Sequence, residues 1–116
     1  MTGNPEYRIA DIAALEALYG SVNDTSRLKE IDHLHPAYVA LIKASPFAVL
    51  ATGGAGGMDA SPRGDLGGVV DIVDDKTLIL PDRRGNNRID SLRNIVENPR
   101  VALIFLVPGL GETLRV

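Results

Sequence analysis

The pattern of hydrophobic and polar positions changes character near Ser45. Before this residue, apolar side chains recur every three or four positions, as they do on one face of an amphipathic helix. The pattern predicts a helix over residues 5–19, with Pro5 near its start and Gly20 just after its end. The polar stretch that follows, residues 21–34, is predicted to be a connection.

A second, shorter helix is predicted from Pro36 to Ala44. The Ser45-Pro46 pair should end it, because the residue before a proline is pushed out of helical backbone angles. The first half of the chain is therefore predicted to be helical up to this proline.

After Pro46 the apolar segments become short and rich in Val, Ile and Leu, which is typical of strands. One helix interrupts them, over residues 88–97, and the Asn98-Pro99 pair should close it. The first strand is a short apolar run, as expected of a strand buried on both faces. The predicted strands cover residues 47–52, 68–75, 76–81 and 100–107, with a tight hairpin at 74–76. The pattern indicates an α+β chain whose antiparallel strands close into a small barrel.

Composition narrows the class of protein. The chain has 116 residues, 45% of them hydrophobic and 23% charged, which is ordinary for one globular domain. A net charge of −3 argues against a nucleic-acid-binding module, and no apolar run is long enough to span a membrane. The absence of cysteine excludes disulfides, thiolate metal sites and cysteine nucleophiles, and favours a cytoplasmic location.

A metal site is not expected. The only histidines, His33 and His35, are two residues apart, whereas a helical pair of zinc ligands is spaced by four. No third ligand lies nearby in the sequence, so both are interpreted as surface residues or as residues at the start of the second helix.

Seven of the twelve glycines fall between residues 53 and 68. The run Gly53–Gly57 lacks the Lys-Ser/Thr ending of a phosphate-binding P-loop and does not open a helix, so it is predicted to be a turn. Glycines 64, 67 and 68 surround charged residues inside a β region, where glycine marks a bulge or a close approach of a ligand.

Arginines gather where the 76–81 strand leads into the helix over residues 88–97. Residues 83–100 contain five arginines against two acidic residues, a local balance of +3. Helix N-termini favour anions, and arginine side chains can hold a phosphate with two hydrogen bonds. The pattern favours a phosphate site at the first turn of this helix, with Asn87 as N-cap and Asp90 three residues later. The proposed ligands are Arg83, Arg84, Arg88 and Ser91; a surface cluster paired with Asp82 and Asp90 is the alternative.

A second polar segment, Asp59–Asp65, stands where an ordinary strand would alternate with apolar residues. Arg63 and Asp65 are two residues apart and would share one face of a strand. They are interpreted either as a surface ion pair or as one wall of a polar ligand cleft.

These segments, taken in order, resemble the pyridoxamine 5′-phosphate oxidase-like flavin-binding proteins, in particular a bacterial subgroup of predicted FMN-binding proteins. The resemblance covers roughly residues 36–116 and is specific as a combination. It rests on the segments Ser45–Thr52, Asp59–Asp65, Leu80–Arg88, Asp90–Asn94 and Asn98–Arg100.

The resemblance implies a Greek-key split β-barrel that dimerises, with FMN held between the two subunits. By position, Arg63 matches the strand-borne arginine of the family, and Asn87-Arg88 occupy the place of its phosphate-binding turn. Pro81 and Asp82 stand where the end of a strand approaches the flavin ring. The full expected cofactor-binding set is Ser61, Arg63, Asp65, Pro81, Asp82, Arg83, Arg84, Asn87, Arg88 and Ser91.

The resemblance predicts an FMN-binding oxidoreductase of unidentified substrate, and the residues by themselves point to no catalytic acid or base. The alternatives are a non-catalytic flavin-binding or flavin-storage protein, and a β-barrel dimerisation module without a cofactor. Residues 1–35 are expected to be a helical extension and residues 36–116 the FMN-binding domain. The chain stops at Glu112–Val116 in what looks like mid-strand, so the barrel is expected to be incomplete at that end.

Overall fold

The computed structural model describes residues 8–20, 29–64, 68–82 and 89–116. The chain divides into two compact units, Met1–Ile31 and Asp32–Val116. The first unit contains helix α1 (Ile12–Tyr19), which begins where the Asp11 carboxylate accepts a hydrogen bond from the Ala14 N–H at 2.8 Å. The predicted helix and its end at Gly20 are confirmed, but residues 8–11 are not helical, so the predicted start near Pro5 is wrong.

The second unit opens with helix α3 (Pro36–Ala44), whose predicted bounds are confirmed. Proline fits the first turn of a helix, where its missing N–H has no partner to lose, and the His35 ring accepts from the Ala37 N–H at 3.1 Å. His35 therefore lies at the helix start, as expected. The buried Ser45 hydroxyl that follows lies 2.7 Å from the carbonyl oxygens of Phe47 and Leu106, between two neighbouring strands.

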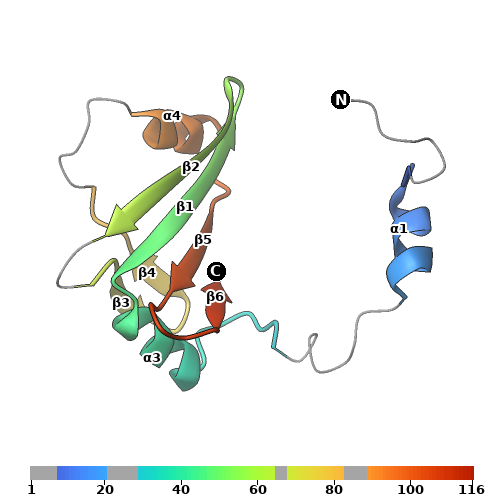
Figure 1. Cartoon of the computed structure of the whole chain (residues 1–116). Coiled ribbons are helices and arrows are strands. Elements are labelled where there is room, and N and C mark those ends of the chain that lie inside the picture. Colours follow the sequence, from blue (N-terminus) through green and yellow to red (C-terminus); the bar gives the residue numbers. More distant parts are fainter. Residues whose placement is uncertain (1–7, 21–28, 65–67, 83–88) are drawn as a thin grey trace. The chain divides into compact units, whose positions relative to one another are not determined.

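Four strands form an antiparallel sheet in the order β2-β1-β5-β6 (Figure 1). The long pair β1 (Phe47–Gly54) and β2 (Gly57–Gly64) is a hairpin with a two-residue connection. Gly57 has a φ of 121°, which a side chain would strain, so the predicted glycine-rich turn is confirmed. Strands β5 (Ala102–Leu106) and β6 (Thr113–Arg115) complete the sheet.

A separate two-stranded sheet consists of β3 (Asp71–Asp74) and β4 (Thr77–Ile79). The predicted hairpin at residues 74–76 is confirmed, and the Asp74 carboxylate accepts from the Lys76 N–H in its turn at 2.8 Å. Both strands are shorter than predicted. An irregularity between Ile72 and Asp74 interrupts their register.

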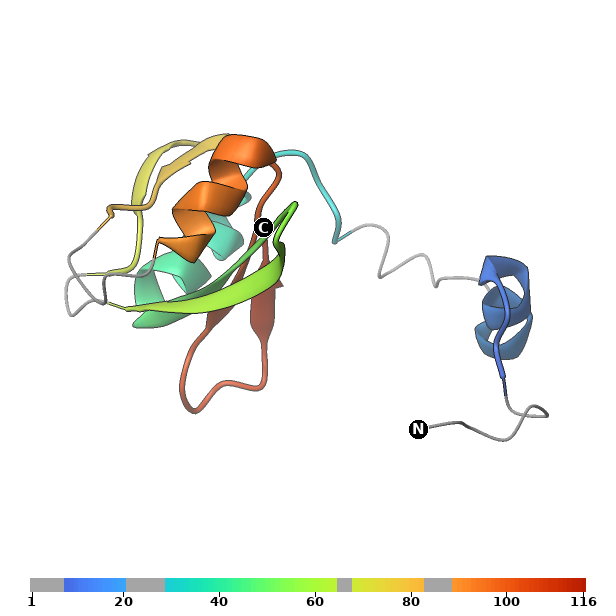
Figure 2. The same ribbon diagram turned by 90° about the horizontal axis from the view of Figure 1, so that it is seen from above.

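Helix α4 (Asp90–Glu97) lies against the β1–β2 hairpin (Figure 2). Its end at Asn98 agrees with the predicted stop at Asn98-Pro99. It begins at Asp90 with Ile89 in the N-cap position, so the prediction that Asn87 is the N-cap is wrong. Ile89 has no side chain that can accept a hydrogen bond from the first turn.

The core lies on one face of the four-stranded sheet. Ala48 and Leu50 of β1 are buried with Phe105 of β5, and α3 and the β3–β4 pair pack against them. The opposite face of β1 is only half-buried, so the prediction that this strand is buried on both faces is wrong. The buried hydrophobic residues of the described chain are Ile42, Ala48, Leu50, Val69, Leu103, Phe105 and Leu114.

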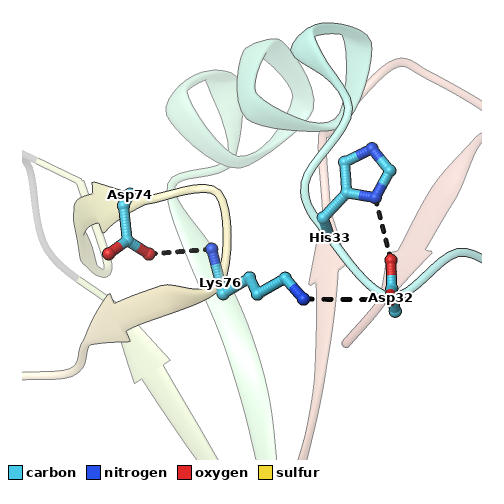
Figure 3. A network of polar contacts seen from close by, with 4 residues as sticks. All are labelled: Asp32, His33, Asp74 and Lys76. Atoms are coloured by element: carbon cyan, nitrogen blue, oxygen red, sulfur yellow. Dashed lines mark hydrogen bonds and ion pairs between the residues drawn. The ribbon is translucent and has the colours of Figure 1, made fainter.

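Polar contacts connect the segment before α3 to the β3–β4 turn (Figure 3). The Leu34 N–H donates to the Asp75 carbonyl at 2.6 Å. The Asp32 carboxylate lies 3.0 Å from Nδ1 of His33 and 3.8 Å from Nζ of Lys76. Hydrogen bonding and the charge of His33 lower the pKa of Asp32 below its ordinary value.

The architecture is α+β with antiparallel strands, as predicted. The described strands form an open four-stranded sheet and a separate pair, and they do not close into a barrel.

Candidate functional site

The face of β2 that looks toward the core carries a row of three polar side chains: Asp59, Ser61 and Arg63. In the antiparallel register they stand opposite Thr52, Leu50 and Ala48 of β1, all of which are buried. Residues directly opposite in such a pair share one face of the sheet. The row therefore lies at the margin of the core, and each of its members is half-buried.

Among the described residues, the Arg63 guanidinium has fewer partners than its position requires. Its side chain is only 24% exposed, and one terminal nitrogen lies 3.8 Å from Oδ1 of Asp82. Its Nε is buried and has no hydrogen-bond partner among the described residues. A buried N–H without an acceptor is costly, and a charged one more so. This group fits an anionic acceptor such as a phosphate oxygen.

Pro81 and Asp82 lie in the segment that follows strand β4. Pro81 is half-buried, and the Asp82 side chain is 64% exposed. The structure thus brings two of the predicted residues together: Arg63 of β2 and Asp82 of the segment that follows β4. Ser61 lies two residues from Arg63 on the same face of β2.

Ser91 lies elsewhere. It stands in the first turn of α4, where it is buried and its hydroxyl donates to Oδ2 of Asp59 at 2.9 Å. Asp59 and Arg63 are four residues apart on β2, which corresponds to about 13 Å along a strand. Ser91 therefore binds the end of the polar row that lies away from Arg63.

A polar face of α4 holds the helix to the hairpin. Asn94 donates from Nδ2 to Oγ1 of Thr52 at 3.1 Å, and the Ala55 N–H donates to Oε2 of Glu97 at 2.6 Å. With Ser91, these residues recur every three positions and so share one helix face. A Cβ on Gly54 would come within 2.6 Å of Asn94 and Glu97 side-chain oxygens, so glycine permits this close packing.

Sequence reasoning did not single out Asp59, Thr52, Asn94 or Glu97 as site residues. The signal that could have found the helix partners is the three-residue spacing of Ser91, Asn94 and Glu97. Because this spacing places the three polar side chains on one face of a helix, it predicts that the helix packs against the rest of the protein through hydrogen bonds.

The rest of the expected cofactor-binding set, Asp65, Arg83, Arg84, Asn87 and Arg88, falls outside the described residues. Within the described ranges, no group of three or more His, Asp or Glu side chains is arranged to hold a metal ion. No helix in those ranges has the length and apolar character needed to cross a membrane.

The sequence profile of the pyridoxamine 5′-phosphate oxidase family matches residues 34–116, well over half of the chain. The chain belongs to this family. No curated protein sequence and no solved structure matches it. All the hydrogen bonds and the ion pair described for β2 and α4 lie within the matched range of this pyridoxamine 5′-phosphate oxidase family member.

Members of the pyridoxamine 5′-phosphate oxidase family commonly bind a flavin. Among the described residues, the group that fits a flavin phosphate is Arg63, because its charge is fixed and its Nε is buried without an acceptor. Ser61, on the same strand face, offers a hydroxyl two residues away.

Proposed function

We propose that the protein binds FMN and acts as a flavin-dependent oxidoreductase related to pyridoxamine 5′-phosphate oxidase. The observation that carries the proposal is the buried Nε of Arg63 at the margin of the core, which has no partner among the described residues and lies inside the region that matches the family. A phosphate monoester carries close to two negative charges at neutral pH and accepts several hydrogen bonds. It would satisfy both the charge and the free N–H of this side chain.

The arginine-rich segment of residues 83–88 supplies further positive charge in the proposal, with Asn87 and Arg88 at the phosphate-binding turn. Its contribution follows from the sequence, since three arginines stand within six residues directly after Asp82. Bound FMN would supply the electron-transfer chemistry, while the protein binds and orients it and tunes its electronic properties. Pro81 and Asp82 would lie near the flavin ring, and Asp65 and Ser91 complete the proposed set.

We further propose that the protein forms a homodimer built on split barrels. The side of the sheet opposite the core carries the half-buried apolar residues Phe47, Val49, Ile104 and Leu106, which pair directly across β1 and β5. Such a surface favours burial against another sheet or subunit. A flavin site between subunits and a cytoplasmic location, in line with the cysteine-free composition, belong to the same proposal.

The first experiment compares the affinities of FMN and riboflavin, which differ by the phosphate group. The protein should purify with, or take up, a yellow chromophore and bind FMN more tightly than riboflavin. Arg63→Ala should weaken FMN binding by about 1.5–3 kcal/mol, tenfold or more, and leave riboflavin binding nearly unchanged. Quenching of flavin fluorescence during titration measures both affinities.

Arg8→Ala is the matched control, because it removes the same charge outside the region that matches the family. It should bind FMN like the original protein. Equal FMN affinity in a folded Arg63→Ala variant would show that this arginine does not hold the phosphate. Reduction of the bound flavin by NAD(P)H, followed by turnover with an added acceptor, distinguishes an oxidoreductase from a flavin-storage protein.

A further inference from the structure

The ion pair between Arg63 and Asp82 is loose. The distance of 3.8 Å from a terminal guanidinium nitrogen to Oδ1 of Asp82 is longer than a hydrogen bond. The Nε of the same guanidinium takes no part in the pair and has no partner among the described residues. Asp82 thus supplies negative charge to Arg63 without satisfying its hydrogen-bonding capacity.

Asp82 is also easily exchanged for another anion. Its side chain is 64% exposed, against 24% for Arg63, so the carboxylate can return to water while the arginine stays at the margin of the core. An ion pair with one largely exposed partner contributes little stability. Since Asp82 stands outside the regular strands, just after β4, its departure breaks no strand pairing.

We propose that Asp82 is a resident carboxylate that neutralises Arg63 in the absence of a ligand and that a phosphate group displaces. The proposal rests on the proposed function, because it assigns the regulation of the same anion site. A phosphate monoester outcompetes the carboxylate because it carries more charge and more acceptor oxygens. A neutral ligand gains nothing from this exchange, so Asp82 raises selectivity for doubly charged ligands at the expense of affinity.

The alternative is that Asp82 positions Arg63 for the ligand. A carboxylate that orients an arginine typically makes two short, parallel hydrogen bonds to it. Here the contact with Asp82 is 3.8 Å long and does not involve Nε, which has no partner in the part of the chain that the structure describes, so the observed geometry favours a displaceable counter-charge.

The test uses Asp82→Asn in the full chain, with Asp71→Asn as the matched control. Asp71 is an exposed residue of the adjacent β3–β4 pair, so its replacement changes the net charge equally. Asp82→Asn should bind FMN about two- to fivefold more tightly than the original protein, since the competing charge is gone. Asp82→Asn should change the riboflavin affinity by less than the FMN affinity, because riboflavin lacks the phosphate that competes with the carboxylate. Asp71→Asn should alter neither affinity by more than about twofold.

Inorganic phosphate provides a readout that does not involve the flavin ring. It should shift the Arg63 Nε–H resonance in NMR spectra at lower concentrations in Asp82→Asn than in the original protein. The effect of Asp82→Asn on FMN affinity should also disappear in the Arg63→Ala background, because the two changes act on one interaction.

The two proposals fail in different ways. Asp82→Asn could bind FMN with unchanged or lower affinity while Arg63→Ala still lowers FMN affinity. That result overturns the proposal that Asp82 is a displaceable carboxylate and leaves the proposed phosphate site in place. Equal FMN affinity in Arg63→Ala and the original protein overturns the phosphate site itself, and the role of Asp82 with it.

Discussion

At the scale of single residues, Asp32 is an exposed side chain whose pKa is lowered mainly by its neighbour in the chain. Its carboxylate lies beside His33 and Lys76 (Figure 3). The Leu34 N–H, two residues after Asp32, donates to the carbonyl of Asp75 in the β3–β4 turn. The hydrogen bond and charge of His33 are the main causes of the lowered pKa of Asp32, and Lys76 contributes least. The pKa therefore depends mostly on a residue next to it in the chain.

His33→Ala should raise the pKa of Asp32 back toward its ordinary value, and Lys76→Ala should raise it by a smaller amount. Because the folded-state pKa of Asp32 is lowered, its contribution to stability is complete above its ordinary pKa. That contribution is lost as the pH falls through the lowered value. The chemical shift of the Asp32 carboxyl carbon, followed against pH, measures the pKa of Asp32 in the original protein and in the two variants. A larger effect of Lys76→Ala than of His33→Ala would contradict the assigned cause.

At the scale of elements, α4 docks through its polar side chains. Ser91, Asn94 and Glu97 bind the hairpin, whereas Leu92 is 39% exposed and Val96 is 86% exposed. The pattern of Ile89, Leu92, Ile95 and Val96 correctly predicts a helix, yet it does not predict which face meets the sheet. Three hydrogen bonds from this polar face therefore hold α4 to the hairpin.

Asn94→Ala should destabilise the protein by about 1–3 kcal/mol, because it leaves the Thr52 hydroxyl, 2% exposed, without its partner. Arg93→Ala, at an exposed position of the same helix, should change the free energy of unfolding by less than about 0.5 kcal/mol. Chemical denaturation measures both. Adding Thr52→Val to Asn94→Ala should recover part of the loss, since the buried hydroxyl is then gone. A double variant no more stable than Asn94→Ala would argue against a cost from the unpaired hydroxyl.

At the scale of the whole molecule, the second unit contains the complete core of the described residues. Every buried hydrophobic side chain belongs to Asp32–Val116. The family profile begins at residue 34, close to the start of this unit. Sequence reasoning placed its domain boundary between residues 35 and 36, in the same part of the chain.

A chain limited to residues 32–116 should therefore unfold in one cooperative transition. Its free energy of unfolding should lie within about 1 kcal/mol of that of the full chain, because it keeps every buried core residue that the structure describes. Thermal and urea denaturation of the two chains, at equal concentrations, provide the comparison. A greater loss would show that residues 1–31 contribute to the stability of this unit.

The sequence by itself determined the features that depend on neighbouring residues. Pro36 begins α3 and Pro46 follows its end, and Asn98-Pro99 stops α4. The turns at Asp74–Lys76 and Gly53–Gly57 form where the residue types favour turns. The order of the polar segments along the chain was also enough to predict the family to which the protein belongs. These results follow from local backbone sterics and hydrogen bonds, which do not require knowledge of the distant chain.

Only the tertiary structure decided which distant residues meet. The order β2-β1-β5-β6 places β5 beside β1 across about fifty intervening residues, a pairing that no local pattern encodes. The same packing brings Asp82 to Arg63 and directs Ser91 to Asp59. The resemblance to the family already marked Arg63 as a candidate for binding the cofactor. The fold adds the physical reason, because it buries the Nε of Arg63 without giving it a partner among the described residues.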